Sequence, residues 1–365
     1  MLTLSEGDRQ AFFEAPFNAY DRNGPYVSPM HSDVFRMLDA RANPLFSVGN
    51  PFAFWTAHRD GKPIGRIVAV VHKQSNDRHG TKRAQFGFFD CADDLDAAKL
   101  LLDAACDFGH RHGMTELAGN FNLTAMQQSG VVTDGFDAQA YTDMVVNPPH
   151  VPRLLEHNGF EAFFPMSTFS LELDEAVLPP AEPAAIAAGG YSFAPIRRAD
   201  FAVRMEEARH VLNDGFSDNP MFVPLTAEEF SFQAQEMMSI LDPRLSAVLH
   251  HDGKPVGTII CIPDLNGFMK DSGSRYGLMT PWHFLRYRLN RRRAVIIFYS
   301  VVRDHHSLGL NSAMLNRVIS ALRDGGYRQL GITWIADQNG ASLRQMEKVG
   351  AKRLQRLHLF RKALI

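Results

Sequence analysis

The chain has 365 residues, of which 45% are hydrophobic and 21% are charged, and its formal net charge is −2. This composition describes a soluble globular protein with enough residues for two domains, and it excludes a disordered chain, a strongly basic nucleic-acid-binding protein and a membrane-spanning protein. The three cysteines, Cys91, Cys106 and Cys261, have no paired spacing. They predict reduced thiols in a cytoplasmic protein rather than disulfides or a zinc site.

The first half of the chain predicts a mixed α/β unit. A β-hairpin turns at Asp60-Gly61 between two apolar runs, and a strand at 83–91 follows it. A helix is expected over 95–113, with Gly113 as its stop signal and an apolar face formed by Leu95, Ala98, Leu102, Ala105 and Phe108. The remaining elements are a strand, a short helix and a second strand, at 116–121, 151–160 and 161–173.

The second half repeats this order after a segment rich in Ala, Pro and Gly, which predicts a linker at 176–189. A second hairpin turns at Asp252-Gly253. The other expected elements are strands at 191–196, 293–302, 327–335 and 352–360 and helices at 199–216, 310–326 and 339–350. We therefore expect two domains, residues 1–175 and 190–365, each with a mixed, mostly antiparallel sheet and flanking helices.

Two short sequences recur at nearly the same offset. "HRDGKPIGRI" begins at His58 and "HHDGKPVGTI" begins at His250, 192 residues later. Glu156 in "LLEHNGF" and Glu347 in "QMEKVGA" are 191 residues apart. Because one offset accounts for both pairs, we interpret the chain as an internal duplication rather than a chance recurrence of a common hairpin tip.

The junction between the strand at 293–302 and the helix that starts at Leu310 is the main candidate for ligand binding. A helix start that follows a strand presents free backbone N–H groups and the positive end of the helix dipole, which suits phosphate oxygens. Gly309 lets the backbone approach a ligand, and Arg303 with His305 or His306 can add positive charge. The alternative is that Gly309 serves the turn alone.

These residues resemble the GNAT superfamily of N-acyltransferases, through "HSLGLNSAM" for the acyl-CoA loop and "NGASLRQMEKVGA" for the later helix. The resemblance implies acyl-CoA as cosubstrate. It implies cofactor-binding roles for Val301, Val302, Arg303, His306, Ser307, Leu308, Gly309, Leu310, Asn311 and Asn339. Met346 lies where the family often has a tyrosine acid. The corresponding junction of the first half carries three aspartates and no glycine, so only the second half is expected to bind acyl-CoA.

A narrower resemblance spans both halves in order. "PFNAYDRNGPYVSP", "GNFN", "NPPHVPRLLEHNGF" and "IPDLN" resemble tandem-GNAT bacterial proteins that include the bacterial ceramide synthases. This implies transfer of a fatty acyl group to the amine of a long-chain sphingoid base, 3-ketosphinganine or sphinganine, to give a ceramide-type lipid. The alternatives are a GNAT acyltransferase that acts on a small amine or peptide, and a non-catalytic GNAT-like binding module.

Individual roles remain open at this level. Tyr299, Asp264 and His305 are candidates for the acid or base, each with an ordinary structural alternative as a core tyrosine, a turn aspartate or a surface histidine. The degenerate first half is expected to bind the acceptor through Asn120, Asn122 and Asp143, unless the Asn side chains only cap loops. None of the paired histidines has the spacing that a metal site needs, so we expect no metal.

Residues 267–293 combine aromatic and aliphatic side chains with arginines. This mixture predicts peripheral contact with the inner face of a membrane, or alternatively an ordinary insertion that packs on its own domain. Because the net charge is negative and no basic stripe runs through the chain, we expect no nucleic-acid partner.

Overall fold

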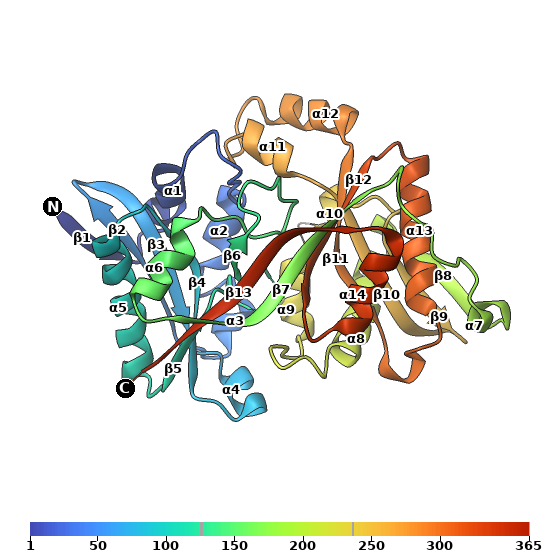
Figure 1. The fold of residues 1–365 in the computed structure, drawn as a ribbon, viewed down its shortest axis with the longest axis horizontal. Helices are drawn as coiled ribbons and strands as arrows, with labels where there is room; N and C mark the ends of the chain where they lie inside the picture. The colour runs from blue at the N-terminus through green and yellow to red at the C-terminus, as the bar shows by residue number, and fades with distance from the viewer. Residues whose placement is uncertain (125–126, 236, 365) are drawn as a thin grey trace. The chain divides into compact units, whose positions relative to one another are not determined.

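The computed structural model describes residues 1–124, 127–235 and 237–364 and has the mixed α/β fold class predicted from the sequence. The chain forms two compact units (Figure 1). The first contains Met1–Ser167, Asn266–His283 and Gln355–Ile365, and the second contains Thr168–Leu265 and Phe284–Leu354. The units therefore do not follow chain order, because each half contributes a segment to the other unit.

The first unit is built on a sheet in which all pairs except β4–β5 are antiparallel. Its strands, in spatial order, are β1 (Leu2–Glu6), β2 (Phe52–Arg59), β3 (Lys62–Val70), β4 (Arg83–Cys91), β5 (Glu116–Gly119) and β13 (Lys352–Ala363), and β6 (Val131–Asp134) also pairs with β13. The predicted hairpin is β2–β3, with Asp60 and Gly61 both at positive φ as a tight turn requires.

Helices cover both faces of this sheet. On one face α5 (Leu95–Arg111) and α6 (His150–His157) pack on Trp55 and Ile67; on the other, α1 (Arg9–Ala19), α2 (His31–Met37) and α3 (Pro44–Ser47) pack on Phe54 and Val68. Neighbouring strand residues thus point to opposite cores. The unit also contains α4 (Lys73–His79) and α11 (Asn266–Asp271).

The predicted face of α5 needs one correction. Leu95 is 49% exposed, because it is the first residue after the N-cap Asp94 and lies beyond the packed turns. The buried face starts at Ala97 and comprises Ala97, Ala98, Leu101, Leu102, Ala105, Cys106, Phe108 and Gly109. The helix ends at Arg111, and Gly113 adopts the left-handed conformation of a stop signal.

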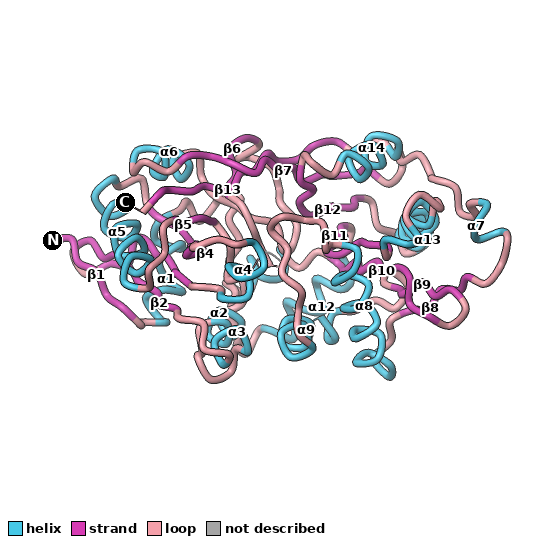
Figure 2. Tube along the Cα trace, turned by 90° about the horizontal axis from the view of Figure 1, so that it is seen from below, coloured by secondary structure: helices cyan, strands magenta, loops and turns pink. Residues whose placement is uncertain are grey.

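The second unit has the same plan. Its strands, in spatial order, are the later part of β7 (Glu161–Glu172), β12 (Gln329–Ala336), β11 (Arg293–Val301), β10 (Lys254–Pro263), β9 (Ala247–His251) and β8 (Tyr191–Pro195). Figure 2 shows α13 (Leu310–Asp324) and α14 (Gly340–Val349) on one side of these strands and α8 (Phe201–Gly215) on the other. The other α-helices of this unit are α7 (Ala184–Ala187), α9 (Ala227–Ala234) and α10 (Met237–Ile240), and α12 (Thr280–Asn290) starts in the first unit and continues into the second at Phe284.

The two sheets repeat the same strand register. Gly65 pairs with Cys91 and Arg66 with Asp90 across β3–β4. Gly257 pairs with Val301 and Thr258 with Ser300 across β10–β11. Since Gly65 and Gly257 are 192 residues apart, as the two copies of the hairpin motif are, the sequence repeat has a matching repeat of strand pairing.

The last strand of the chain closes the sheet of the first unit. Phe360 of β13 lies opposite Gly119 of β5 and is fully buried in the core under α5 and α6. The C-terminal residues therefore form part of the core of the first unit, although all other residues of that unit lie more than 70 positions earlier in the chain.

We expect Phe360→Ala to lower the free energy of unfolding by about 3–5 kcal/mol, because it leaves a cavity in a close-packed core. Urea denaturation followed by circular dichroism measures the change. Leu178→Ala is the control, since Leu178 is 43% exposed. Equal stability of the two variants would show that β13 adds little to the first unit.

Candidate functional site

In the second unit, strands β11 and β12 pair for only part of their length. The parallel ladder runs from Arg293↔Gln329 to Ile296↔Ile332, although the strands continue to Val301 and Ala336. A bulge interrupts the pairing of β10 with β11 at the residue where the β11–β12 ladder ends. Cys261 pairs with Ile296, whereas the preceding residue, Ile260, pairs with Phe298. The sheet therefore splits here, and backbone groups of β11 become available to an extended ligand.

The end of β11 leads directly to the N-terminus of α13. Gly309 is the N-cap residue, with φ of 77°, and it provides no side chain to cap the helix. The first helical hydrogen bond runs from the Ala313 N–H to the Gly309 carbonyl, so the N–H groups of residues 310–312 precede the helical ladder. These donors and the helix dipole are suited to phosphate oxygens, and the phosphate site itself stays a prediction.

The charged groups of this loop already have partners. The guanidinium of Arg303 lies 3.7 Å from Asp214 and 3.9 Å from Asp218, and its backbone N–H donates to Asp214. His306 Nε2 lies 3.0 Å from the carbonyl oxygen of Val301 and donates to it. The positive potential of the site therefore comes mainly from backbone N–H groups, and a ligand that pairs with Val301 would compete with the His306 ring for the same carbonyl oxygen.

Two buried polar atoms near the α13 N-terminus have no partner within the described part of the chain. They are His305 Nδ1 and Asn311 Oδ1. A buried polar group without a partner is costly, so such atoms indicate a place where a ligand or water completes the hydrogen bonding. Leu310 is buried in the core, whereas Ser307 and Leu308 are exposed on the loop.

The three candidate acid–base residues are not brought together. Tyr299 donates its hydroxyl to the carbonyl of Asn311 and accepts from Gln345 Nε2 at 3.0 Å, and burial raises its pKa well above the ordinary value. Asp264 pairs with Arg293 at 3.1 Å, at the start of β11. That places it roughly 26 Å along the strand from Val301. Tyr299 and His305 remain near the loop, and Asn339 caps α14 through the Ser342 N–H.

In the first unit the corresponding split is filled by the chain itself. Strands β4 and β5 also pair over four residues, from Arg83↔Glu116 to Phe86↔Gly119. Beyond that point Asn122 Oδ1 accepts from the Phe88 N–H at 2.7 Å, and Asn120 Oδ1 accepts from the Phe89 N–H at 3.1 Å. Two backbone donors that an extended ligand would need are thus already used.

Gly87 makes this filling possible. A Cβ atom at position 87 would lie 1.7 Å from the carbonyl oxygen of Phe121, which no side chain could tolerate. The absence of a side chain therefore lets residues 120–122 approach β4.

The N-terminus of α5 also differs from that of α13. Asp94 caps α5 by accepting from the Ala97 N–H at 3.1 Å, and it forms a bidentate pair with Arg59 at 2.6 and 2.8 Å. Asp93 and Asp96 flank it. A carboxylate already occupies the place that an anionic ligand would take. That only the second half binds acyl-CoA stays a prediction.

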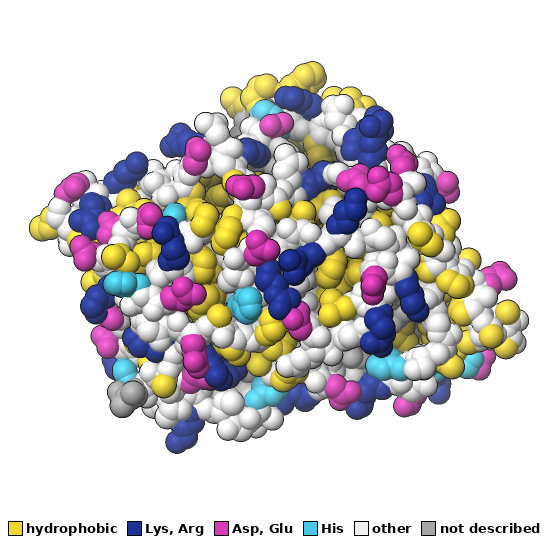
Figure 3. Space-filling view, in the orientation of Figure 1, with side chains coloured by type: hydrophobic (Ala, Val, Ile, Leu, Met, Phe, Trp, Pro, Cys, Tyr) yellow, Lys and Arg dark blue, Asp and Glu magenta, His cyan; other side chains and the backbone are white. Residues whose placement is uncertain are grey.

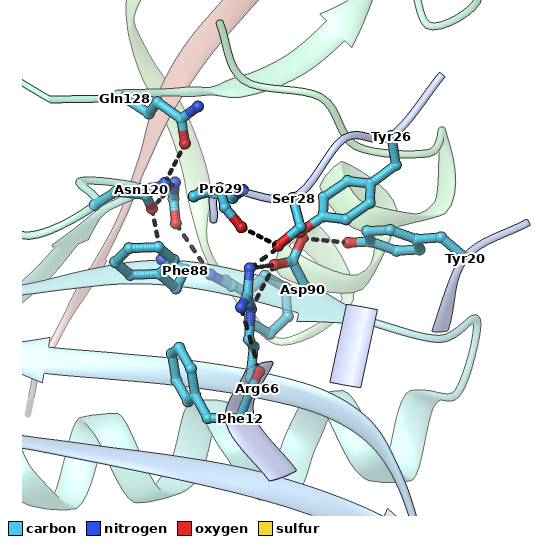
Figure 4. Close-up of polar contacts among 12 residues, drawn as sticks. Phe12, Tyr20, Tyr26, Ser28, Pro29, Arg66, Phe88, Asp90, Asn120 and Gln128 are labelled. Carbon is cyan, nitrogen blue, oxygen red and sulfur yellow. Dashed lines mark hydrogen bonds and ion pairs between the residues drawn. The ribbon is translucent and has the colours of Figure 1, made fainter. Parts of the chain in front are cut away.

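A small pocket with a cavity volume of about 30 Å³ lies beside the filled split. Asn120, Asn122 and Gln128 line one part of it, and Asn122 is hydrogen-bonded to each of the other two side chains. Figure 4 shows Asn120 and Gln128 on this side of the pocket. Arg66 and Asp90 line another part. The pocket therefore combines amide groups with a buried ion pair.

The ion pair is held from several sides. Arg66 is 2% exposed, and its Nε and Nη2 lie 2.8 and 2.7 Å from Asp90 Oδ2. Tyr20 donates to Asp90 Oδ1 at 2.8 Å, Arg66 donates to the Tyr26 hydroxyl at 3.1 Å, and the guanidinium lies over the ring of Phe12. Burial raises the pKa of both tyrosines, so they stay neutral donors and acceptors.

Sequence reasoning missed this cluster. The signal was a single arginine within the apolar run "IGRIVAVV". Because side chains alternate along a strand, Arg66 shares a face with Val68 and Val70, which are buried, and a charged residue at such a position needs a partner. Asp143, the third predicted acceptor residue, does not line the pocket, although the next residue, Met144, does. Asp143 is half-buried at φ of 70°, and desolvation raises its pKa to about 7.

Two further findings concern the described residues only. They contain no group of three or more His, Cys, Asp or Glu side chains that could hold a metal ion. None of their helices combines the length and the apolar character needed to cross a bilayer.

Residues 208–351 match the model of the acetyltransferase (GNAT) family. Over 99% of its length the chain is 24% identical to protein YghO of Escherichia coli K12, covering 94% of that protein. It is 26% identical to a bacterial ceramide synthase of Caulobacter vibrioides, covering 99% of this chain and 96% of that one. A tandem GNAT protein from the clavulanic acid biosynthesis pathway has the same fold, with a TM-score of 0.61, 15% identity and coverage of 100% of this chain and 99% of that one.

These comparisons confirm the resemblance predicted from the sequence. The matched segment includes β11, the loop and the uncapped N-terminus of α13. GNAT proteins use acetyl- or acyl-CoA as cosubstrate, and the geometry of this loop fits that ligand. Residues 208–351 thus match the GNAT acetyltransferase family, and over its whole length the chain has the fold of a tandem GNAT protein.

Proposed function

We propose that the protein transfers a fatty acyl group from acyl-CoA to the amine of a long-chain sphingoid base, 3-ketosphinganine or sphinganine, and forms a ceramide-type lipid. The observation that carries this proposal is the uncapped α13 N-terminus at the split between β11 and β12. The full-length similarity to a bacterial ceramide synthase supports the choice of acceptor.

The second unit binds the acyl-CoA in this proposal. The pantetheine arm pairs along Val301–Arg303, where the β11 edge has lost its β12 partner, and the pyrophosphate contacts the N–H groups of residues 307–311. In this proposal the ligand competes with the His306 ring for the Val301 carbonyl, and the ring moves away. The released imidazole then adds a donor for the phosphates, and Asn339 lies at the start of the next helix.

The reaction needs a neutral amine and a stabilised oxyanion. Attack of the amine nitrogen on the thioester carbonyl forms the C–N bond, and collapse of the tetrahedral adduct breaks the C–S bond and releases the thiolate. Backbone N–H groups of β11 beyond Ile296 are placed to receive the oxyanion. Of the three candidate bases, Tyr299 is held as a neutral phenol and Asp264 is paired with Arg293. His305 remains the candidate, although its ring packs against Tyr191 and His251 and would have to turn toward the amine.

The first unit binds the polar head of the acceptor in this proposal. Asn120, Asn122 and Gln128 present amide groups to the pocket, and amides suit the hydroxyl or keto oxygen of a sphingoid base. A substrate with a long apolar chain partitions into bilayers. We therefore also propose that the protein works in the cytoplasm, in peripheral contact with the inner face of the membrane through residues 267–293.

We expect the purified protein, incubated with palmitoyl-CoA and 3-ketosphinganine, to release free thiol and form amide in a one-to-one ratio. Thiol assay and mass spectrometry of the lipid product measure the two. Amide on a small amine or a peptide but not on the lipid would favour a GNAT enzyme with a polar acceptor. No turnover together with no CoA binding would favour a non-catalytic module.

Leu308→Glu should weaken CoA binding at least tenfold, because it places a carboxylate beside the N-terminus that receives the phosphates. Isothermal titration calorimetry measures the dissociation constant. Leu178→Glu is a matched control, since Leu308 is 41% and Leu178 43% exposed and both gain the same charge. If both substitutions weakened CoA binding equally, the phosphates would not bind at this loop.

Asp143→Asn should stabilise the protein more at pH 8 than at pH 5. Burial raises the pKa of Asp143 from 3.8 to about 7 in the folded protein. Folding therefore takes up a proton between these values, and the contribution of Asp143 to stability falls as pH rises through that window. Urea denaturation at both pH values tests this, with Asp137→Asn at an exposed position as control. A pH-independent difference would contradict it.

A further inference from the structure

Helix α12 has no buried residue over its 11 positions, Thr280–Asn290. A helix of this length is marginally stable in water by itself, and helices in folded proteins owe most of their stability to an apolar face that packs on something. The helix therefore has more apolar surface than its own protein covers.

The exposed apolar side chains form one face of the helix. Trp282, Leu285 and Leu289 follow at intervals of three and four residues, which places them on the same side, and they are 58%, 49% and 75% exposed. Leu278 and Met279, in the turn before the helix, are also exposed. Phe284 and Tyr287, on the opposite side, are half-buried, so the helix turns its weaker apolar side inward.

The charge around this face is almost entirely positive. Residues 267–293 contain seven Lys and Arg and one Asp, in a chain whose net charge is −2. Arg286, Arg288 and Arg292 are exposed on or just after the helix. Figure 3 shows hydrophobic and basic side chains side by side over α11 and α12, at the top of the view.

We propose that α12 is an interfacial helix that docks on an anionic lipid bilayer. Trp282, Leu285 and Leu289 insert among the acyl chains, and the arginines contact the lipid phosphates. This proposal deepens the proposed function and rests on it, because a lipid acceptor is the reason for the protein to bind a membrane. Binding itself requires neither acyl-CoA nor acceptor.

Several features favour a bilayer over an acidic protein partner. The apolar residues are a tryptophan and unbranched or γ-branched aliphatics on an exposed helix face, and Trp prefers the boundary between head groups and acyl chains. The long arginine side chains can extend to phosphates while their stems cover apolar surface. The arginine excess selects anionic head groups.

The test is vesicle sedimentation of the full chain without substrates. One set of vesicles is phosphatidylcholine alone, and the other contains about one quarter phosphatidylglycerol. We expect sedimentation with the anionic set, weakened by salt. Arg286→Gln with Arg288→Gln should lower the binding constant about 25-fold, at roughly fivefold per charge. Trp282→Ser with Leu285→Ser should lower it at least tenfold.

Val177→Ser with Val203→Ser is the matched control, because these residues are 60% and 59% exposed outside the segment, and it should bind as wild type does. Thermal unfolding checks that all variants fold. Absence of wild-type sedimentation with anionic vesicles, equal binding by both α12 variants and wild type, or retention by a polyglutamate column but not by vesicles would each overturn the proposal. Vesicle binding without acyl transfer would leave it standing and count against the proposed reaction alone.

Discussion

The hydrogen-bond ladder between β11 and β12 stops after four residue pairs, and the chemistry assigned to the second unit depends on that stop. A strand inside a sheet has its N–H and C=O groups satisfied and offers nothing to a ligand. A strand that loses its neighbour midway exposes those groups in a regular row, still aligned by the neighbour on its other side. For β11 that neighbour is β10, which pairs with it as far as Gly257↔Val301. This edge of β11 therefore has no β12 partner beyond Ile296, while β10 still holds the strand in place.

The helix that follows adds the second requirement. Because β11 leads into α13 through a loop that ends in Gly309, the free strand edge and the uncapped helix N-terminus lie in sequence along the chain. An extended ligand with amides at one end and phosphates at the other matches that order. In the first unit the ladder stops at the same place, but Asn120 and Asn122 satisfy the freed N–H groups and Asp94 caps the helix. The same scaffold is therefore open in one copy and closed by its own side chains in the other.

Much of this could be predicted from the sequence, because the information was local. The hairpin turns, the helix stops at Gly113 and Gly350 and the glycine at the α13 N-terminus depend on neighbouring residues, and the repeated motif fixed the correspondence of the halves. The exchange of strands between units was not predictable, since nothing local says that Phe360 lies opposite Gly119. The sequence also does not predict that residues 120–122 fill the split of the first unit. The need for a glycine at position 87 becomes clear only from the close approach of the Phe121 backbone.

The Arg66–Asp90 pair is a further difference between the two units. The equivalent positions in the second unit hold Thr258 and Ser300, which need no charge partner. Removing a single member of a buried ion pair leaves an uncompensated charge and costs about 3–5 kcal/mol, whereas replacing both members by apolar residues is often tolerated. Arg66 also supports Tyr26 and Phe12, and Asp90 supports Tyr20, so the penalty extends to the neighbouring helix α1 and the segment after it. The pair therefore stabilises a polar pocket in the first unit, at positions where the second unit has two small hydroxyl side chains.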